Sequence, residues 1–180
     1  MVIHRTNGAD EASAALREAY TGVRAKAGKG VAHAEDVGRI LGAAGCAEPV
    51  RLAGVLHDVV EDTAWTVDEV SARFGAAVGG LVAAVTEDDS IASYRPRKRA
   101  LREQIARAGP DAIDIALADK VASLRYALEH GKRIPKRKIA HYVATLAMTD
   151  AAGHPDLGRD VADLLATLDA CDHPPVPLAP

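Results

Sequence analysis

The sequence predicts an all-α protein, a single compact domain built from several helices. Hydrophobic residues make up 48% of the chain and aromatic residues only 3%, so the core must consist mainly of Ala, Leu and Val. Segments that are rich in alanine, poor in β-branched residues and interrupted by glycine and proline favour helices over strands. Apolar residues also recur at helical spacing through most of the chain. The sequence shows no convincing strand pattern and no internal repeat.

The first half of the chain predicts five helices. They cover about residues 10–25, 31–44, 49–59, 66–75 and 76–86. Asp10 is suited to cap the first helix, and Pro49 suits the first turn of the third. Thr66 and Glu69 form a capping-box pattern that opens the fourth helix, which Gly75 ends. The fifth helix is apolar almost all round, so we expect it to be central.

The second half predicts four more helices. They cover about residues 96–108, 110–130, 135–148 and 157–168. Gly109 stops the first of these and Pro110 starts the second, while Gly131 and Pro135 separate the second from the third.

The remaining segments predict loops and a tail. Residues 24–30 are basic and rich in glycine, and residues 87–93 are polar, so both predict loops. The Pro-rich segment 173–180 is expected to be a disordered tail. We therefore predict one domain over residues 1–172.

Charge and cysteine usage restrict the partners and the compartment. The formal net charge of −3 indicates neither a nucleic-acid nor a membrane partner. The spacing of Cys46 and Cys171 suggests neither a metal site nor a redox pair. With no signal peptide and no apolar run of about 18 residues, we expect a cytoplasmic protein with reduced thiols. We expect a monomer or a small homo-oligomer.

One stretch concentrates the candidate chemistry. Residues 52–63 read LAGVLHDVVEDT, in which His57 and Asp58 interrupt an apolar run and Glu61 and Asp62 follow within one helical turn. Burying unpaired ionisable groups costs several kcal/mol or neutralises them. A bound divalent cation removes that cost because it supplies the opposite charge.

Two further residues complete a candidate ligand set with His57 and Asp58. His33 lies in the second predicted helix, and Asp119 interrupts an apolar helix. Imidazole and carboxylate ligands without a thiolate suit Mn²⁺, Mg²⁺, Fe²⁺ or Zn²⁺. Two His and two Asp leave coordination positions for water and substrate, as in a catalytic site.

These residues carry a resemblance to a known family. The pattern His33, His57-Asp58, Glu61-Asp62 and Asp119 resembles the HD-domain metal-dependent phosphohydrolases. More narrowly, VLHDVVEDT, FGAAVGGLVAAVTEDD and LADK are similar to the hydrolase domain of RelA/SpoT-type enzymes and to the single-domain small alarmone hydrolases. The similarity covers about residues 20–146.

The resemblance implies an all-helical fold, a Mn²⁺ ion and removal of the 3′-pyrophosphate from guanosine tetra- or pentaphosphate, which yields GDP or GTP. The metal ligands it implies are His33, His57, Asp58 and Asp119. Glu61 and Asp62 match the catalytic acid pair, with acid and base unassigned between them. Arg24 and Tyr142 match residues of the nucleotide pocket.

Basic residues are candidates for the phosphate clamp, and some positions depart from the family. Lys26 on the basic loop and Lys98 on the basic helix are candidates for binding phosphates.

Ser123 stands where the family has a nucleotide-contacting asparagine, and Ala25 takes the place of a lysine, with Lys26 displaced by one. These changes affect substrate recognition and leave the metal ligands and the acids intact.

Two alternatives therefore stay open. The protein could be an HD phosphohydrolase or phosphatase that acts on another nucleotide, such as NADPH, or a non-catalytic HD domain that senses a nucleotide. A sensor has no need for Glu61 and Asp62 beside a complete ligand set. The sequence therefore favours an enzyme.

Overall fold

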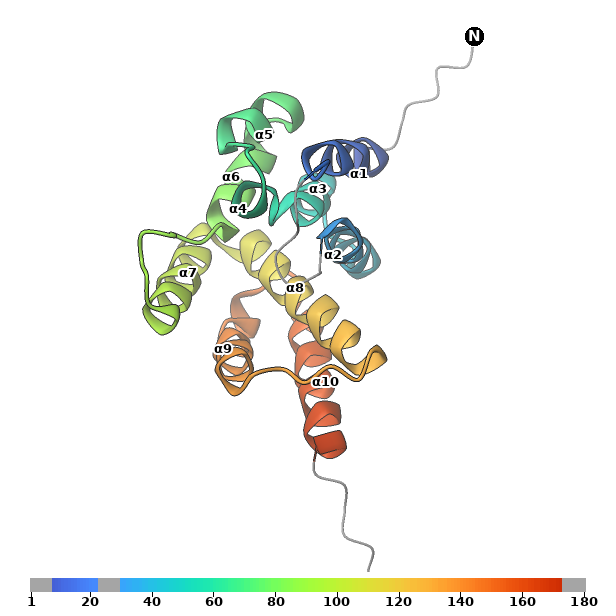
Figure 1. Cartoon of the computed structure of the whole chain (residues 1–180), viewed down its shortest axis with the longest axis vertical. Helices are drawn as coiled ribbons and strands as arrows, with labels where there is room; N and C mark the ends of the chain where they lie inside the picture. Colours follow the sequence, from blue (N-terminus) through green and yellow to red (C-terminus); the bar gives the residue numbers. More distant parts are fainter. Residues whose placement is uncertain (1–7, 23–29, 173–180) are drawn as a thin grey trace, which may run out of the picture.

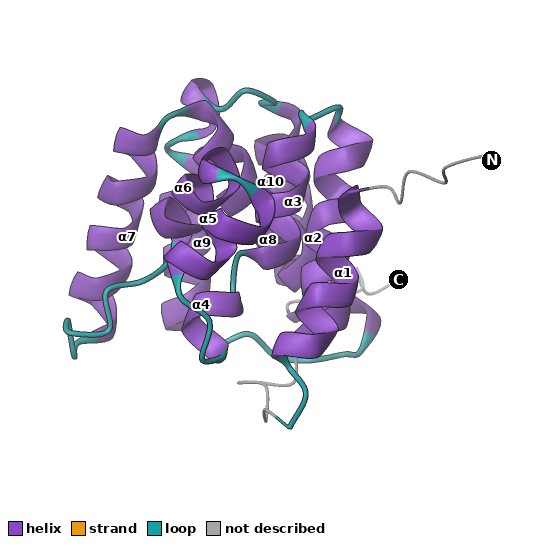
Figure 2. Cartoon of the chain, turned by 90° about the horizontal axis from the view of Figure 1, so that it is seen from above, coloured by secondary structure: helices purple, strands orange, loops and turns teal. Residues whose placement is uncertain are grey.

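The computed structural model describes residues 8–22 and 30–172, without the side chains of residues 170–172. Within these ranges every regular element is helical, which confirms the all-α prediction (Figure 2). The helices are α1 (Gly8–Ala19), α2 (Gly30–Ala44), α3 (Glu48–Leu56), α4 (Val59–Asp62), α5 (Val67–Phe74), α6 (Ala76–Val85), α7 (Tyr94–Ala108), α8 (Pro110–Glu129), α9 (Lys136–Leu146), the 3₁₀ turn η2 (Thr149–Ala151) and α10 (Asp156–Asp172). No helix in the described ranges is long and apolar enough to cross a membrane.

Helix α8 is the centre of the fold. Figure 1 shows it, in yellow, running through the middle of the molecule, with α2 and α3 on one side and α9 and α10 on the other. Leu117, Val121 and Leu124 are fully buried along it. A helix that is apolar on nearly every face is stable only when other elements surround it, and α8 accordingly contacts α2, α3, α6, α7, α9 and α10.

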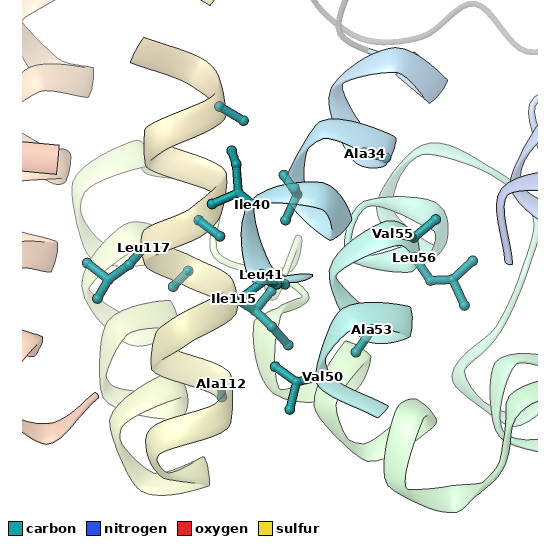
Figure 3. Close-up of a cluster of buried hydrophobic side chains, with 14 of the residues drawn as sticks. Ala34, Ile40, Leu41, Val50, Ala53, Val55, Leu56, Ala112, Ile115 and Leu117 are labelled. Atoms are coloured by element: carbon teal, nitrogen blue, oxygen red, sulfur yellow. The ribbon is translucent and has the colours of Figure 1, made fainter. Parts of the chain in front are cut away.

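Close packing of α2 against α3 holds the two segments that carry the histidines. A Cβ atom on Gly54 of α3 would lie 2.3 Å from Leu41 Cδ1, and one on Gly38 of α2 would lie 2.3 Å from Val55 Cγ2. Only glycine permits so close an approach. Figure 3 shows Leu41 next to Ile115 of α8, where the three helices meet.

Two expectations about the helices are wrong. The helix predicted over residues 49–59 ends at Leu56, and a turn at His57 and Asp58 separates it from the short α4. The His57 side chain forms a hydrogen bond with the Gly54 carbonyl at 2.8 Å, in the last turn of α3. Helix α6 is not central, because only Val78, Gly79 and Val82 are buried along it. Its apolar pattern consists largely of Ala and Gly, which expose little hydrophobic surface.

Several other local predictions hold, although Asp10 lies inside α1 and does not cap it. The capping box of Thr66 and Glu69 forms, and α5 ends at Gly75. Gly109 ends α7 with a φ of 100°, a conformation that glycine adopts readily. Helix α1 ends at Ala19, earlier than predicted, and α10 is longer than predicted at both ends. The tail 173–180 lies outside the described residues.

Candidate metal centre and active site

The structure brings the four predicted ligands together from three parts of the fold. His33 lies on α2, His57 and Asp58 lie in the turn between α3 and α4, and Asp119 lies on α8. Ligand atoms of His33, His57 and Asp58 lie within 4.8 Å of one another. Asp119 Oδ1 is 2.9 Å from His33 Nε2 and 3.9 Å from His57 Nε2.

The orientation of His57 fits a bound cation. When its proton is on Nδ1, that nitrogen donates to the Gly54 carbonyl, and Nε2 presents a lone pair, as in metal-ligating histidines. Nε2 lies 3.1 Å from Asp58 Oδ2. Nε2 is buried and has no hydrogen-bond partner among the described residues. A nitrogen lone pair that faces a carboxylate needs a cation between or beside them.

The carboxylates also affect the pKa of His57. Burial alone lowers this pKa, but Asp58 and Asp119 outweigh burial and raise it to about 9. The metal-free site therefore holds a proton on His57 as its counter-charge. A divalent ion has to displace that proton.

The two acids of α4 stand in different surroundings. Glu61 Oε1 accepts a hydrogen bond from the Glu87 backbone N–H at 2.7 Å. Burial raises the pKa of Glu61 to about 7, assisted by the charges of Asp58 and Glu87. Asp62 instead accepts a hydrogen bond of 3.1 Å from the Tyr20 hydroxyl of the turn after α1. The two carboxylates therefore differ in their burial and in their hydrogen-bond partners.

A small cavity of about 50 Å³ adjoins this cluster. Its polar wall consists of His57, Asp58, Glu61, Glu87, Lys98, Asp119 and Lys120. Asp62 is not part of this wall, which leaves Glu61 as the member of the acid pair that faces the cavity. This volume is enough for a few water molecules.

Three residues that the sequence reasoning did not single out support the site. Lys120 is buried and its Nζ lies 2.5 Å from Asp119 Oδ2. Glu87 forms ion pairs with Lys98 and with Arg97, the latter at 2.7 Å. Tyr20 is the third, through its bond to Asp62. Lys120 and Glu87 lie within the motifs LADK and FGAAVGGLVAAVTEDD quoted above, whereas Tyr20 lies in no quoted motif.

A larger basic groove adjoins the cavity. It has a volume of about 720 Å³ and runs between α7 and α9. Its cationic lining residues are Arg95, Lys98, Arg99, Arg102 and Arg137. Lys98 lines both the groove and the cavity, so the two adjoin at this side chain.

The remaining predicted substrate residues are placed as follows. Arg24 and Lys26 lie outside the described residues. Ser123 is buried, and its hydroxyl donates to Asp119 Oδ1 at 3.3 Å. Tyr142 is also buried, and its ring centroid lies 5.6 Å from Lys120 Nζ. Tyr142 is not one of the residues that line the basic groove.

Comparisons with known proteins identify the family and the fold. The model of a family described as "HD domain" matches residues 12–147. Guanosine-3′,5′-bis(diphosphate) 3′-pyrophosphohydrolase MESH1 of Homo sapiens is 47% identical over 73 residues, which are 41% of this chain and 40% of the human protein. The protein of that name from Drosophila melanogaster is 42% identical over 97 residues, 53% of this chain and 54% of the fly protein. The matched segment thus spans about half or less of these relatives' length.

Solved structures extend the similarity over most of the chain. One is described as "A metazoan ortholog of SpoT hydrolyzes ppGpp and plays a role in starvation responses". It has a TM-score of 0.72 and 28% identity, and the match covers 93% of this chain and 98% of that one. A structure from Listeria monocytogenes has a TM-score of 0.64 and 31% identity, and the match covers 76% of this chain and 92% of that one.

Proposed function

The chain belongs to the HD-domain family, and on that premise we propose that it removes the 3′-pyrophosphate from guanosine tetra- and pentaphosphate, yielding GDP or GTP and pyrophosphate. The observation that carries the proposal is the convergence of His33, His57, Asp58 and Asp119 beside Glu61, at the end of a basic groove. The relatives named above, whose names specify this reaction, support the choice of substrate.

HD domains depend on a divalent metal, and the four ligands would hold it. Nitrogen and oxygen donors without sulfur support Mn²⁺ as the ion. When bound, the ion supplies an acidified water and positive charge for the attacked phosphoryl group. The orientation of His57 by the Gly54 carbonyl and of Asp119 by Lys120 prepares the ligands before the ion arrives.

We assign proton handling to Glu61. A carboxyl group with a pKa of about 7 can both accept and donate a proton near neutral pH. Its contact with the Glu87 backbone N–H holds it in the wall of the cavity. Asp62, which is bonded to Tyr20, acts as a positioning residue that fixes α4 relative to α1.

The basic groove supplies charge for the phosphates. Guanidinium and ammonium groups bind phosphate oxygens through charge-assisted hydrogen bonds. Lys98, at the junction of groove and cavity, is placed for the phosphates nearest the scissile bond, and Arg102 and Arg137 for those further out. Ser123 contacts a metal ligand in the structure, so we assign it to orienting Asp119 and not to binding the nucleotide directly.

The proposal is tested by incubating the full chain and Mn²⁺ with guanosine tetraphosphate and, separately, with NADPH. Pyrophosphate release from guanosine tetraphosphate is expected. Release of orthophosphate from NADPH, with no pyrophosphate released from guanosine tetraphosphate, would instead indicate an HD phosphatase that acts on another nucleotide. Binding of either nucleotide without turnover would replace the proposal by the sensor reading.

Variants separate the roles of the metal ligands and the acid. Asp58→Ala should lose Mn²⁺ and activity together. Glu61→Gln should retain Mn²⁺ and lose about 10²- to 10⁴-fold in kcat, the usual contribution of a general acid or base. Asp163→Asn, on the exposed face of α10, is the matched control and should keep full activity. Loss of Mn²⁺ from folded Glu61→Gln would contradict the assignment.

A further inference from the structure

A second group of potential metal ligands lies away from the active centre. It consists of Cys46 between α2 and α3, Asp114 on α8, and His154 just before α10. His154 Nδ1 lies 2.7 Å from Asp114 Oδ2 and 3.4 Å from Cys46 Sγ. Cys46 Sγ lies 3.9 Å from Asp114 Oδ2. Asp114 is completely buried and Cys46 is 6% exposed.

This cluster is separate from the active centre. Asp114 precedes Asp119 by five residues on α8, which is about 7.5 Å along the helix axis and about 140° around it. The two clusters therefore lie on different sides of the central helix. His154 also lies beyond residues 12–147, the segment that matches the HD domain.

The geometry does not suit a nucleophilic triad. In such a triad the thiol and the carboxylate contact opposite nitrogens of the imidazole, so that a proton can pass from one side to the other. Here both Cys46 Sγ and Asp114 Oδ2 approach the same nitrogen, His154 Nδ1. Sulfur, nitrogen and oxygen donors that converge on one point are instead typical of ligands that share a cation.

We propose that Cys46, Asp114 and His154 bind one Zn²⁺ ion. A tetrahedral zinc with bonds of about 2.0–2.3 Å separates its ligand atoms by about 3.3–3.6 Å. The observed separations of 2.7, 3.4 and 3.9 Å reach these values through shifts well below the length of one bond. A thiolate in the set selects Zn²⁺ over Mn²⁺ or Mg²⁺, so the two centres take different ions.

The surrounding structure orients the ligands and provides access. The His154 backbone N–H donates to Asp114 Oδ1 at 3.0 Å, which turns Oδ2 toward the other two donors. A Cβ on Gly153 would lie 2.8 Å from Asp114 Oδ2, so glycine there permits this close approach. The His154 side chain is 34% exposed and lines a surface cavity of about 470 Å³. An ion would enter from this cavity past His154, the one proposed ligand that lines it.

Zinc at this point would join three segments that are far apart in the sequence. It would connect the α2–α3 turn and the start of α10 to the central helix. We therefore expect it to stabilise the fold, since an ion that binds only the folded chain raises its stability in proportion to the logarithm of the ion concentration.

The test uses Co²⁺ as a spectroscopic substitute for zinc in full-length Asp58→Ala, which removes a ligand of the active centre. A thiolate-to-cobalt charge-transfer band in the near ultraviolet is expected, and added Zn²⁺ should abolish it. The band should disappear when Cys46→Ser is added and persist when Cys171→Ser, the matched control, is added. The proposal is overturned if no band appears while both cysteines are intact. It is also overturned if the band disappears in Cys171→Ser and not in Cys46→Ser.

A second variant guards against misfolding of Cys46→Ser. His154→Gln changes a side chain that is partly exposed, so the helical fold should survive and can be checked by circular dichroism. In the Asp58→Ala background it should lower the affinity for Co²⁺ at least tenfold and abolish the rise in Tm with Zn²⁺. An unchanged affinity for Co²⁺ in folded His154→Gln overturns the proposal.

Discussion

Glu61 should make the metal-free protein less stable than a neutral residue would, and Glu61→Gln measures the effect. Its pKa is raised from 4.5 to about 7, so the folded state binds the proton more tightly than the unfolded state does. Protonation stabilises the fold at low pH, and this contribution is lost as pH rises from about 4.5 to about 7. The pKa of Glu61 in the folded state lies about 2.5 pH units above its ordinary value. At about 1.36 kcal/mol for each pH unit, this corresponds to at most about 3 kcal/mol in the free energy of unfolding.

Gln at position 61 removes the charge and keeps an amide oxygen that can accept the Glu87 N–H bond of 2.7 Å. We therefore expect metal-free Glu61→Gln to match the wild type near pH 4.5 and to exceed its stability by up to about 3 kcal/mol near pH 8. The assay is urea unfolding in the presence of a chelator across this range. A difference that does not change with pH, or a less stable variant at pH 8, would refute the reasoning. Bound Mn²⁺ should shrink the difference, because the ion supplies the missing positive charge.

Three further predictions concern the core, the groove and the metal. Leu124→Ala in α8, where the side chain is fully buried, should lower the free energy of unfolding by about 2–5 kcal/mol. The control Val143→Ala, at a residue 53% exposed, should change it by less than about 0.5 kcal/mol. Equal effects of the two variants in urea denaturation would contradict the burial of Leu124. Lys98→Ala should raise KM for guanosine tetraphosphate about tenfold or more with Mn²⁺ retained, and an unchanged KM would remove Lys98 from the phosphate site. The pKa of His57 is raised to about 9, so a proton competes with Mn²⁺ for this side chain below that pH. The apparent affinity for Mn²⁺, measured by calorimetry, should therefore fall by up to about tenfold for each pH unit below 9. An affinity independent of pH would show that His57 is not a ligand.

Local signals account for the parts of the fold that the sequence predicted correctly. The capping box of Thr66 and Glu69 and the stops at Gly75 and Gly109 depend on atoms within about one helical turn. The break after Leu56 was missed because it is accompanied by a hydrogen bond between the His57 side chain and the Gly54 carbonyl. The spacing of apolar residues does not predict such a bond. The position of α6 was wrong because alanine and glycine satisfy an apolar pattern without needing burial.

The candidate ligands were predictable for a different reason. His57, Asp58 and Asp119 stand out because ionisable residues inside apolar segments have a high cost of burial, and a cation removes it. The same argument does not identify Tyr20 or Glu87, which lie at the ends of helices among other polar residues. Nor does it identify the pair of Cys46 and His154, which are 108 residues apart.

By itself, the sequence determined the helical class, most helix ends and the ligand types of the candidate metal centre. These follow from backbone propensity and from the cost of burying charge, and both act at the level of single segments. Only the tertiary structure decided which of Glu61 and Asp62 faces the cavity, and that Cys46 meets Asp114 and His154. The physical reason is that such contacts depend on how α2, α3 and α10 cross α8, and packing of the whole core sets those crossings.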